Sequence, residues 1–172
     1  MQQRDKYRLA LLAACAIALH GFERLIPTPI PWLRFGFANI ITLITLTLYG
    51  FNAALTITLI RILIGSMVTG TFLGPPFVMS LVGGLFSVTA MWAALRVRIF
   101  GALGLSLIGA LFHNIGQLLA AYAVFIQNLR SILIIAPVIL FLGTLTGVIN
   151  GLAVIFAMAH LKKLSQNVQN TP

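Results

Sequence analysis

The sequence predicts an all-α, polytopic membrane protein with six transmembrane helices in one domain. Of its 172 residues, 60% are hydrophobic and only 8% are charged, whereas soluble domains carry about 25% charged residues. A spanning helix needs about 20 apolar residues, so the chain has room for five or six of them. The net charge of +9 comes from sparse basic residues at the ends of apolar segments. This pattern is typical of membrane loops and not of a nucleic-acid-binding surface.

The helices are predicted between positions where charges, glycines or prolines interrupt the apolar runs. Three prolines in the 26–31 segment exclude a regular helix immediately before the second helix. The Gly74-Pro75-Pro76 sequence ends the third helix. Two candidate break points, Gly143–Gly147 and Asn150–Gly151, fall within the sixth helix. The predicted ranges are 9–25, 33–49, 53–73, 77–95, 99–126 and 132–161.

The distribution of basic residues predicts that both termini are cytoplasmic. With six spans and an inner N-terminus, seven basic residues fall inside and three outside, as the positive-inside rule requires. We therefore expect a multi-pass protein of the bacterial cytoplasmic (inner) membrane. Its parts would be a basic N-terminus at 1–8, a transmembrane domain at 9–161 and a polar cytoplasmic tail at 162–172. The inner residues are Arg4, Lys6, Arg8, Arg96, Arg98, Lys162 and Lys163, and the outer ones are Arg24, Arg34 and Arg130.

Arg61 is the only charged residue in the apolar run from Asn52 to Phe72. A charge at the centre of a bilayer costs at least ~2.5–3.5 kcal/mol, so such a residue usually faces a protein interior, a water-filled cavity or a ligand. The chain has two acidic residues, Asp5 and Glu23. The sequence leaves two alternatives: Arg61 pairs with Glu23 or with backbone carbonyls, or it binds an anionic ligand.

Further polar residues fall inside other predicted spans. His113 and Gln117 are four residues apart and share one helix face, which Asn114 borders. The positions of these residues predict one outward-opening pocket for a small polar or anionic solute. The alternative is a set of interhelical hydrogen bonds worth ~0.6 kcal/mol each. The predicted binding residues are Arg61, Asn39, His113, Asn114, Gln117, Glu23 and Arg34.

The first predicted helix carries small residues at every fourth position, Ala10, Ala14 and Ala18. Such a stripe lets another helix approach closely, either a partner subunit or a helix of the same chain. The sequence also lacks an Asp-rich magnesium motif, a phosphate-binding loop, zinc-ligand spacing and a nucleophile elbow. We therefore expect no catalytic residues, no cofactor and no metal site.

Four segments resemble one known family: residues 34–40, 59–66, 80–84 and 113–118, which read RFGFANI, LIRILIGS, SLVGG and HNIGQL. They resemble the Gx transporter family, also named heptaprenyl diphosphate synthase component I, and the resemblance extends from about Leu9 to Leu161. That family is similar to the substrate-binding S components of energy-coupling factor (ECF) transporters. The resemblance implies an S-component-like bundle that captures a solute from outside. It also implies that the AxxxA face from Ala10 to Ala14 docks a transmembrane coupling subunit, which carries two ATPases.

The resemblance leaves more than one function open. The first is a substrate-binding component for an anionic solute, vitamin-like or related to isoprenoids or quinones, energised by partner ATPases. The alternative is a non-catalytic membrane subunit, component I, of a heptaprenyl or polyprenyl diphosphate synthase. Prenyl elongation itself needs Asp clusters for magnesium diphosphate, which this chain lacks. A third interpretation is a stand-alone carrier or a lipid-facing scaffold for quinone export.

Overall fold

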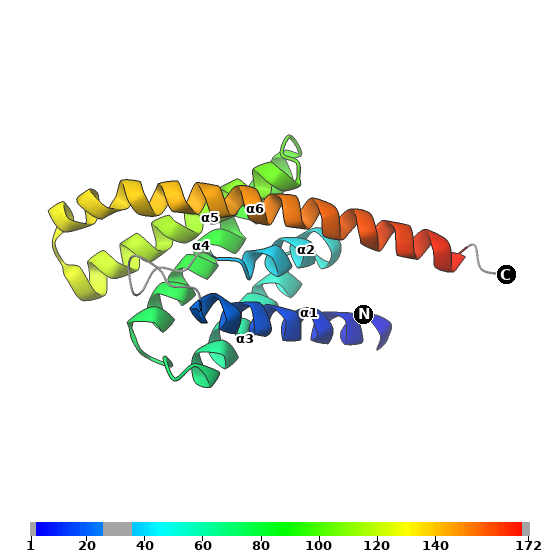
Figure 1. Ribbon diagram of the computed structural model, residues 1–172, viewed down its shortest axis with the longest axis horizontal. Helices are drawn as coiled ribbons and strands as arrows, with labels where there is room; N and C mark the ends of the chain where they lie inside the picture. Colours follow the sequence, from blue (N-terminus) through cyan, green and yellow to red (C-terminus); the bar gives the residue numbers. More distant parts are fainter. Residues whose placement is uncertain (1–2, 26–35, 170–172) are drawn as a thin grey trace.

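The computed structural model describes residues 3–25 and 36–169, which form helices and connecting turns with no strand among them. This confirms the all-α prediction. Successive helices run in alternating directions, so that α1 begins and α6 ends at the same end of the bundle (Figure 1). The elements are α1 (Gln3–Phe22), η1 (Glu23–Leu25), α2 (Asn39–Tyr49), α3 (Phe51–Val68), α4 (Pro75–Val97), α5 (Ala102–Ala120), the π-helical η2 (Ala121–Ile126) and α6 (Leu129–Gln169).

Four segments of the described chain are long and apolar enough to cross a membrane: 51–68, 75–97, 102–126 and 129–160. Helix α2, with 11 residues, is shorter than the thickness of a bilayer requires. Helix α1 has 20 residues, but its first two turns carry four charged side chains, Arg4, Asp5, Lys6 and Arg8. Length and composition therefore support four of the six predicted spans.

Several helix boundaries differ from the predicted ones. Helix α1 begins at Gln3 rather than at residue 9. Helix α3 ends at Val68 rather than at residue 73, and the prolines predicted to end it instead begin α4, where proline is favoured. Helix α2 begins at Asn39 rather than at residue 33, because the chain turns at Gly36, whose φ is +79°. Residues 26–35, with the three prolines and Arg34, lie outside the described part of the chain. Helix α6 continues to Gln169 through both candidate break points.

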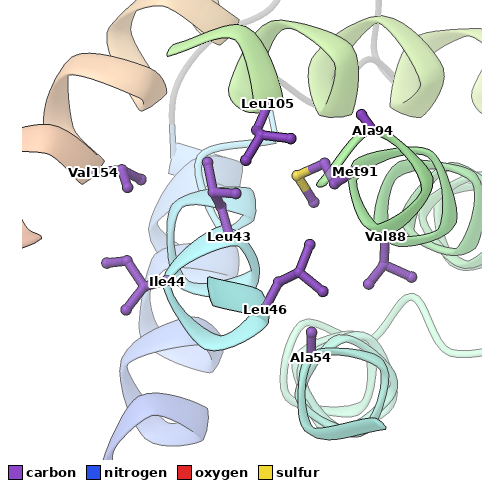
Figure 2. Packing of buried hydrophobic residues seen from close by; sticks show 9 residues of the cluster. All are labelled: Leu43, Ile44, Leu46, Ala54, Val88, Met91, Ala94, Leu105 and Val154. Carbon is purple, nitrogen blue, oxygen red and sulfur yellow. The ribbon is translucent and has the colours of Figure 1, made fainter. Parts of the chain in front are cut away.

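The short helix α2 forms the centre of the bundle. It contacts all five of the other α-helices, and six consecutive residues, 41–46, are buried. A helix that is buried on every side must be enclosed by protein. Figure 2 shows Leu43, Ile44 and Leu46 of α2 among apolar side chains from α3, α4, α5 and α6. The hydroxyl groups of the two buried threonines are satisfied: Thr45 donates to a carbonyl one turn earlier at 2.7 Å, and Thr42 lies 3.2 Å from the hydroxyl of Thr58.

Glycines allow the outer helices to pack closely against one another. A Cβ atom at Gly116 of α5 would lie 2.9 Å from Cα of Gly83 on α4, closer than real Cβ contacts. On α6, Gly147 and Gly151 meet α5 in the same way: Cβ atoms there would lie 3.0 Å from Cβ of Ala110 and 2.7 Å from Cδ1 of Leu103. Van der Waals packing of this kind drives helix association in lipid, and it explains why α6 does not break at its glycines.

We predict that Gly116→Ala destabilises the α4–α5 contact by about 1–3 kcal/mol, because the added methyl group meets backbone atoms that cannot rotate away. Gly21→Ala on α1 is the matched control, since its methyl group meets no atom within 4 Å and alanine favours a helix by up to about 1 kcal/mol. Thermal unfolding of both variants in detergent measures the difference. Equal melting temperatures for the two variants would contradict this packing.

Candidate functional site

Arg61 lies inside the bundle and bridges two neighbouring helices. Its side chain is only 2% exposed, and Nη2 donates a hydrogen bond of 2.9 Å to Oδ1 of Asn39, the first residue of α2. The guanidinium also lies against α4 at Gly84, where a Cβ atom would be 3.9 Å from Nη2. The membrane-embedded charge therefore points into protein, between the start of α2 and a glycine of α4.

His113 and Gln117 form a second buried pair on α5. The amide nitrogen of Gln117 lies 2.6 Å from Nε2 of His113, a contact in which the amide donates and the ring nitrogen accepts. The ring packs against two glycines: a Cβ atom at Gly83 would lie 3.0 Å from Nδ1, and one at Gly36 would lie 3.6 Å from Cδ2. The imidazole ring thus fits here because positions 36 and 83 carry no side chain.

Gly36 is the point at which these polar side chains meet. Its N–H group donates to Oε1 of Glu23, which also accepts the N–H group of Phe37 at 3.1 Å. Its carbonyl accepts from Nδ2 of Asn150 on α6 at 3.1 Å and from the backbone N–H of Asn39 at 2.9 Å. One glycine therefore connects the side chains of Glu23 on η1 and Asn150 on α6 with the backbone of α2, and its α-carbon faces the ring of His113 on α5.

The need for these contacts follows from where α2 begins. Backbone that is not helical is tolerated at membrane depth only where protein or a water-filled cavity surrounds it. The carboxylate of Glu23 and the amide of Asn150 supply partners that a regular helix would have supplied itself. An acidic group also interacts favourably with the positive end of the helix dipole, and Glu23 lies at that end of α2.

The structure brings together five of the predicted site residues around Gly36: Glu23, Asn39, Arg61, His113 and Gln117. Asn114 lies elsewhere, because its Nδ2 donates to the carbonyl of Ile139 on α6 at 3.3 Å and packs against Gly143. Arg34 lies outside the described residues. The stripe of Ala10, Ala14 and Ala18 is exposed on α1, whereas Ala16 and His20 of the same helix are buried in the bundle.

Sequence reasoning missed Gly36 and Asn150 as members of the site. Asn150 is 2% exposed, and an amide within an apolar span is itself a signal of an interhelical hydrogen bond. In the sequence, Asn150 next to Gly151 instead predicts a break in the sixth helix. The role of Gly36 depends on its positive φ and on its neighbours in space, so the sequence carries no comparable signal for it.

Some buried polar atoms of this region have no hydrogen-bond partner among the described residues: Nδ2 of Asn39, Oγ of Ser80 and Oδ1 of Asn150. Ser80 lies one helical turn before Gly84, so both are on the same face of α4. Leaving such a group unsatisfied costs about 1–3 kcal/mol, so a bound polar molecule would be stabilised here. In the described part of the chain, no group of three His, Cys, Asp or Glu side chains is arranged to hold a metal ion.

A family model for heptaprenyl diphosphate synthase component I matches residues 12–157, most of the chain. The chain belongs to the heptaprenyl diphosphate synthase component I family. The four segments that carry the predicted resemblance all fall within the matched range. No curated protein and no solved structure matches the chain. As a member of the component I family, it is a helical protein with segments suited to a membrane, and the family name denotes one part of a synthase.

We predict that Gly36→Ala destabilises the protein more than Gly70→Ala does. Both glycines have a positive φ, +79° and +66°, so both substitutions carry the steric cost of about 1–2 kcal/mol for a left-handed residue. Only at Gly36 does the methyl group also crowd neighbours, Nδ2 of Asn39 at 3.3 Å and the ring of His113. Thermal unfolding in detergent measures the difference in stability. An equal loss of stability in the two variants would contradict the close packing of Asn39 and His113 around Gly36.

Proposed function

We propose that this chain is the membrane-embedded, substrate-binding component of a transporter for a small anionic solute. The observation that carries the proposal is the guanidinium of Arg61, buried and hydrogen-bonded to Asn39 at the internal start of α2. Unpartnered polar atoms of Asn39, Ser80 and Asn150 accompany it in the described structure. Ionisable groups inside membrane spans mark substrate or ion pathways in many proteins.

The chemistry of Arg61 favours a carboxylate or a phosphate. A guanidinium presents several N–H donors in a fixed fork that matches the oxygens of these anions, and charge-assisted hydrogen bonds are about twice as strong as neutral ones. The low dielectric of a buried site strengthens the attraction further. Asn39 would orient the bound group through its free amide nitrogen, and the His113–Gln117 pair would form the opposite wall. Vitamin-like solutes and anions related to isoprenoids or quinones have this chemistry.

The exposed alanines of α1 support the proposal that this chain works together with a partner subunit. Ala10, Ala14 and Ala18 lie on the side of α1 that faces away from the bundle, so the stripe is available to a second protein. We propose that it docks an ECF-type transmembrane coupling subunit, and that the ATPases bound to that subunit hydrolyse ATP. In this assembly the chain crosses the bacterial inner membrane six times, with both termini cytoplasmic.

The family name favours a second candidate, a non-catalytic membrane subunit of a polyprenyl diphosphate synthase. In that case the polar interior would be structural and the catalytic Asp-rich chain would be a separate protein. Proteins that co-purify with the chain distinguish the two candidates, because ATPase subunits support the first and a soluble synthase subunit supports the second.

Native mass spectrometry of the protein, extracted gently from its own membrane, tests the binding site. We expect a small anionic solute on the native protein and at least about tenfold less of it on Arg61→Gln, since a hydrogen bond to a charged group is worth ~1.5–3 kcal/mol. Arg130→Gln is the control, because Arg130 is exposed in the first turn of α6. Thermal unfolding of Arg61→Gln, and of Arg61→Lys, which keeps the charge, checks that each variant still folds. Equal retention of the solute by Arg61→Gln and Arg130→Gln would contradict the proposal.

Co-purification of a coupling subunit tests the docking face. We predict that Ala14→Leu reduces the recovery of that subunit by about tenfold or more, because the larger side chain separates two closely packed helices. It should leave the bound solute unchanged. Ala93→Leu is the matched control, since Ala93 is also exposed but lies on α4. If both variants recover the coupling subunit as well as the native protein does, the stripe is not the docking face.

A further inference from the structure

A second concave site lies at the end of the bundle where α1 begins, away from the polar interior. It is a groove of about 380 Å³ between the α2–α3 turn and the last turns of α4. Its lining residues are Leu46, Gly50, Phe51, Trp92, Leu95, Arg96 and Arg98. The groove therefore combines an apolar floor with two arginines, and no carboxylate lines it.

One arginine of the groove is held in a defined orientation. The guanidinium carbon of Arg96 lies 4.3 Å from the centre of the Trp92 ring, which is close enough for a cation–π interaction. Trp92 in turn packs on Phe51, with 4.9 Å between the ring centres. Stacking uses the face of the guanidinium and leaves the N–H groups at its edge available to an anion.

The second arginine reaches the same groove through an unusual backbone conformation. Residues two apart on a helix point to different sides, so Arg96 and Arg98 would diverge if α4 continued. Arg98 instead caps the helix with a φ of +60°, which is uncommon for a residue other than glycine. Strained backbone of this kind is often found at ligand-binding sites, and here both Arg96 and Arg98 line one groove.

The surroundings of the groove are those of a membrane interface. The apolar segment 75–97 ends here, and tryptophan and arginine are typical of the level of the lipid headgroups. The apolar side chains that follow are exposed: Val97 by 57%, Ile99 by 75% and Phe100 by 40%. Exposed apolar side chains therefore flank Arg98 in the chain.

We propose that this groove binds the phosphate of an anionic phospholipid. The two arginines hold the phosphate through charge-assisted hydrogen bonds, and the apolar floor and the exposed residues at 97–100 contact the start of the acyl chains. Basic pockets between transmembrane helices are suited to lipid headgroups of this class. A free phosphate compound would use the arginines but would leave the apolar surface uncovered.

The full-length protein in nanodiscs of phosphatidylcholine doped with phosphatidylglycerol provides the test, with native mass spectrometry to count the retained lipids. We expect the native protein to retain phosphatidylglycerol in preference to phosphatidylcholine. The double variant Arg96→Gln with Arg98→Gln should lower this retention by roughly thirtyfold, given the contribution of each basic residue near a membrane surface. Trp92→Leu, which removes the ring beneath Arg96, should give an intermediate loss.

The matched control removes the same charge from the same end of the bundle. In Lys6→Gln with Arg8→Gln, both positions are exposed on α1 and neither lines the groove, so retention should fall by about threefold at most. If both double variants lost phosphatidylglycerol equally, retention would depend on the diffuse positive charge of the surface, and the proposal would be overturned. Unchanged retention in Arg96→Gln with Arg98→Gln would also overturn it. Binding of inorganic diphosphate in detergent, without retention of phosphatidylglycerol in nanodiscs, would overturn the assignment to a lipid.

Discussion

The start of α2 inside the bundle is the constraint on which the rest of this structure depends. A helix that begins away from water leaves backbone N–H groups without partners, and the membrane environment offers none. The first N–H groups of α2, at Asn39 and Ile40, donate to the carbonyls of the preceding turn at Gly36 and Phe37. The N–H groups of this turn donate to Glu23, and Asn150 donates to the carbonyl of Gly36. These contacts tie η1 and α6 to the centre of the bundle, and the other helices enclose the apolar body of α2.

The same constraint explains why polar residues gather around one turn. The turn at Gly36 has no side chain, so His113 and Asn39 approach its α-carbon, and Asn39 in turn receives Arg61. Gly83 and Gly84 of α4 admit His113 from one side and the guanidinium from the other. Many transporters bind their substrates where a helix is interrupted near the middle of the membrane. The same cluster of polar side chains can thus satisfy the backbone at the start of α2 and also bind an anion.

Much of the fold is predictable from the sequence because the dominant signals are local. The apolar runs and the turns at Gly50 and Gly74 locate the helices, and the four-residue spacing of His113 and Gln117 indicates their shared face. The position of Arg61 in an apolar run indicates that it points inward. These inferences need only composition and the helical repeat, and the observed helices and contacts agree with them.

The remaining features depend on contacts between distant segments. The sequence cannot show that α2 begins at Asn39, because that boundary depends on Glu23 and Asn150, which are far from it in the chain. It also cannot show that Asn114 faces α6, since a helical repeat gives the face of a residue but not the neighbour that the face meets. Helix α6 stays continuous through Gly143 and Gly147 because α5 packs against them, whereas glycine alone would favour a break.

Hydrogen exchange at the amides of Gly36 and Phe37 tests most directly whether the internal start of α2 is held as described. These two amides lie outside any helix, yet both donate to a buried carboxylate. We expect them to exchange as slowly as the amides of α2, and to exchange much faster in Glu23→Ala. The connection at residues 98–101, which is also outside a helix and is exposed, provides the reference for rapid exchange. Exchange at Gly36 and Phe37 as rapid as in that connection would contradict the account.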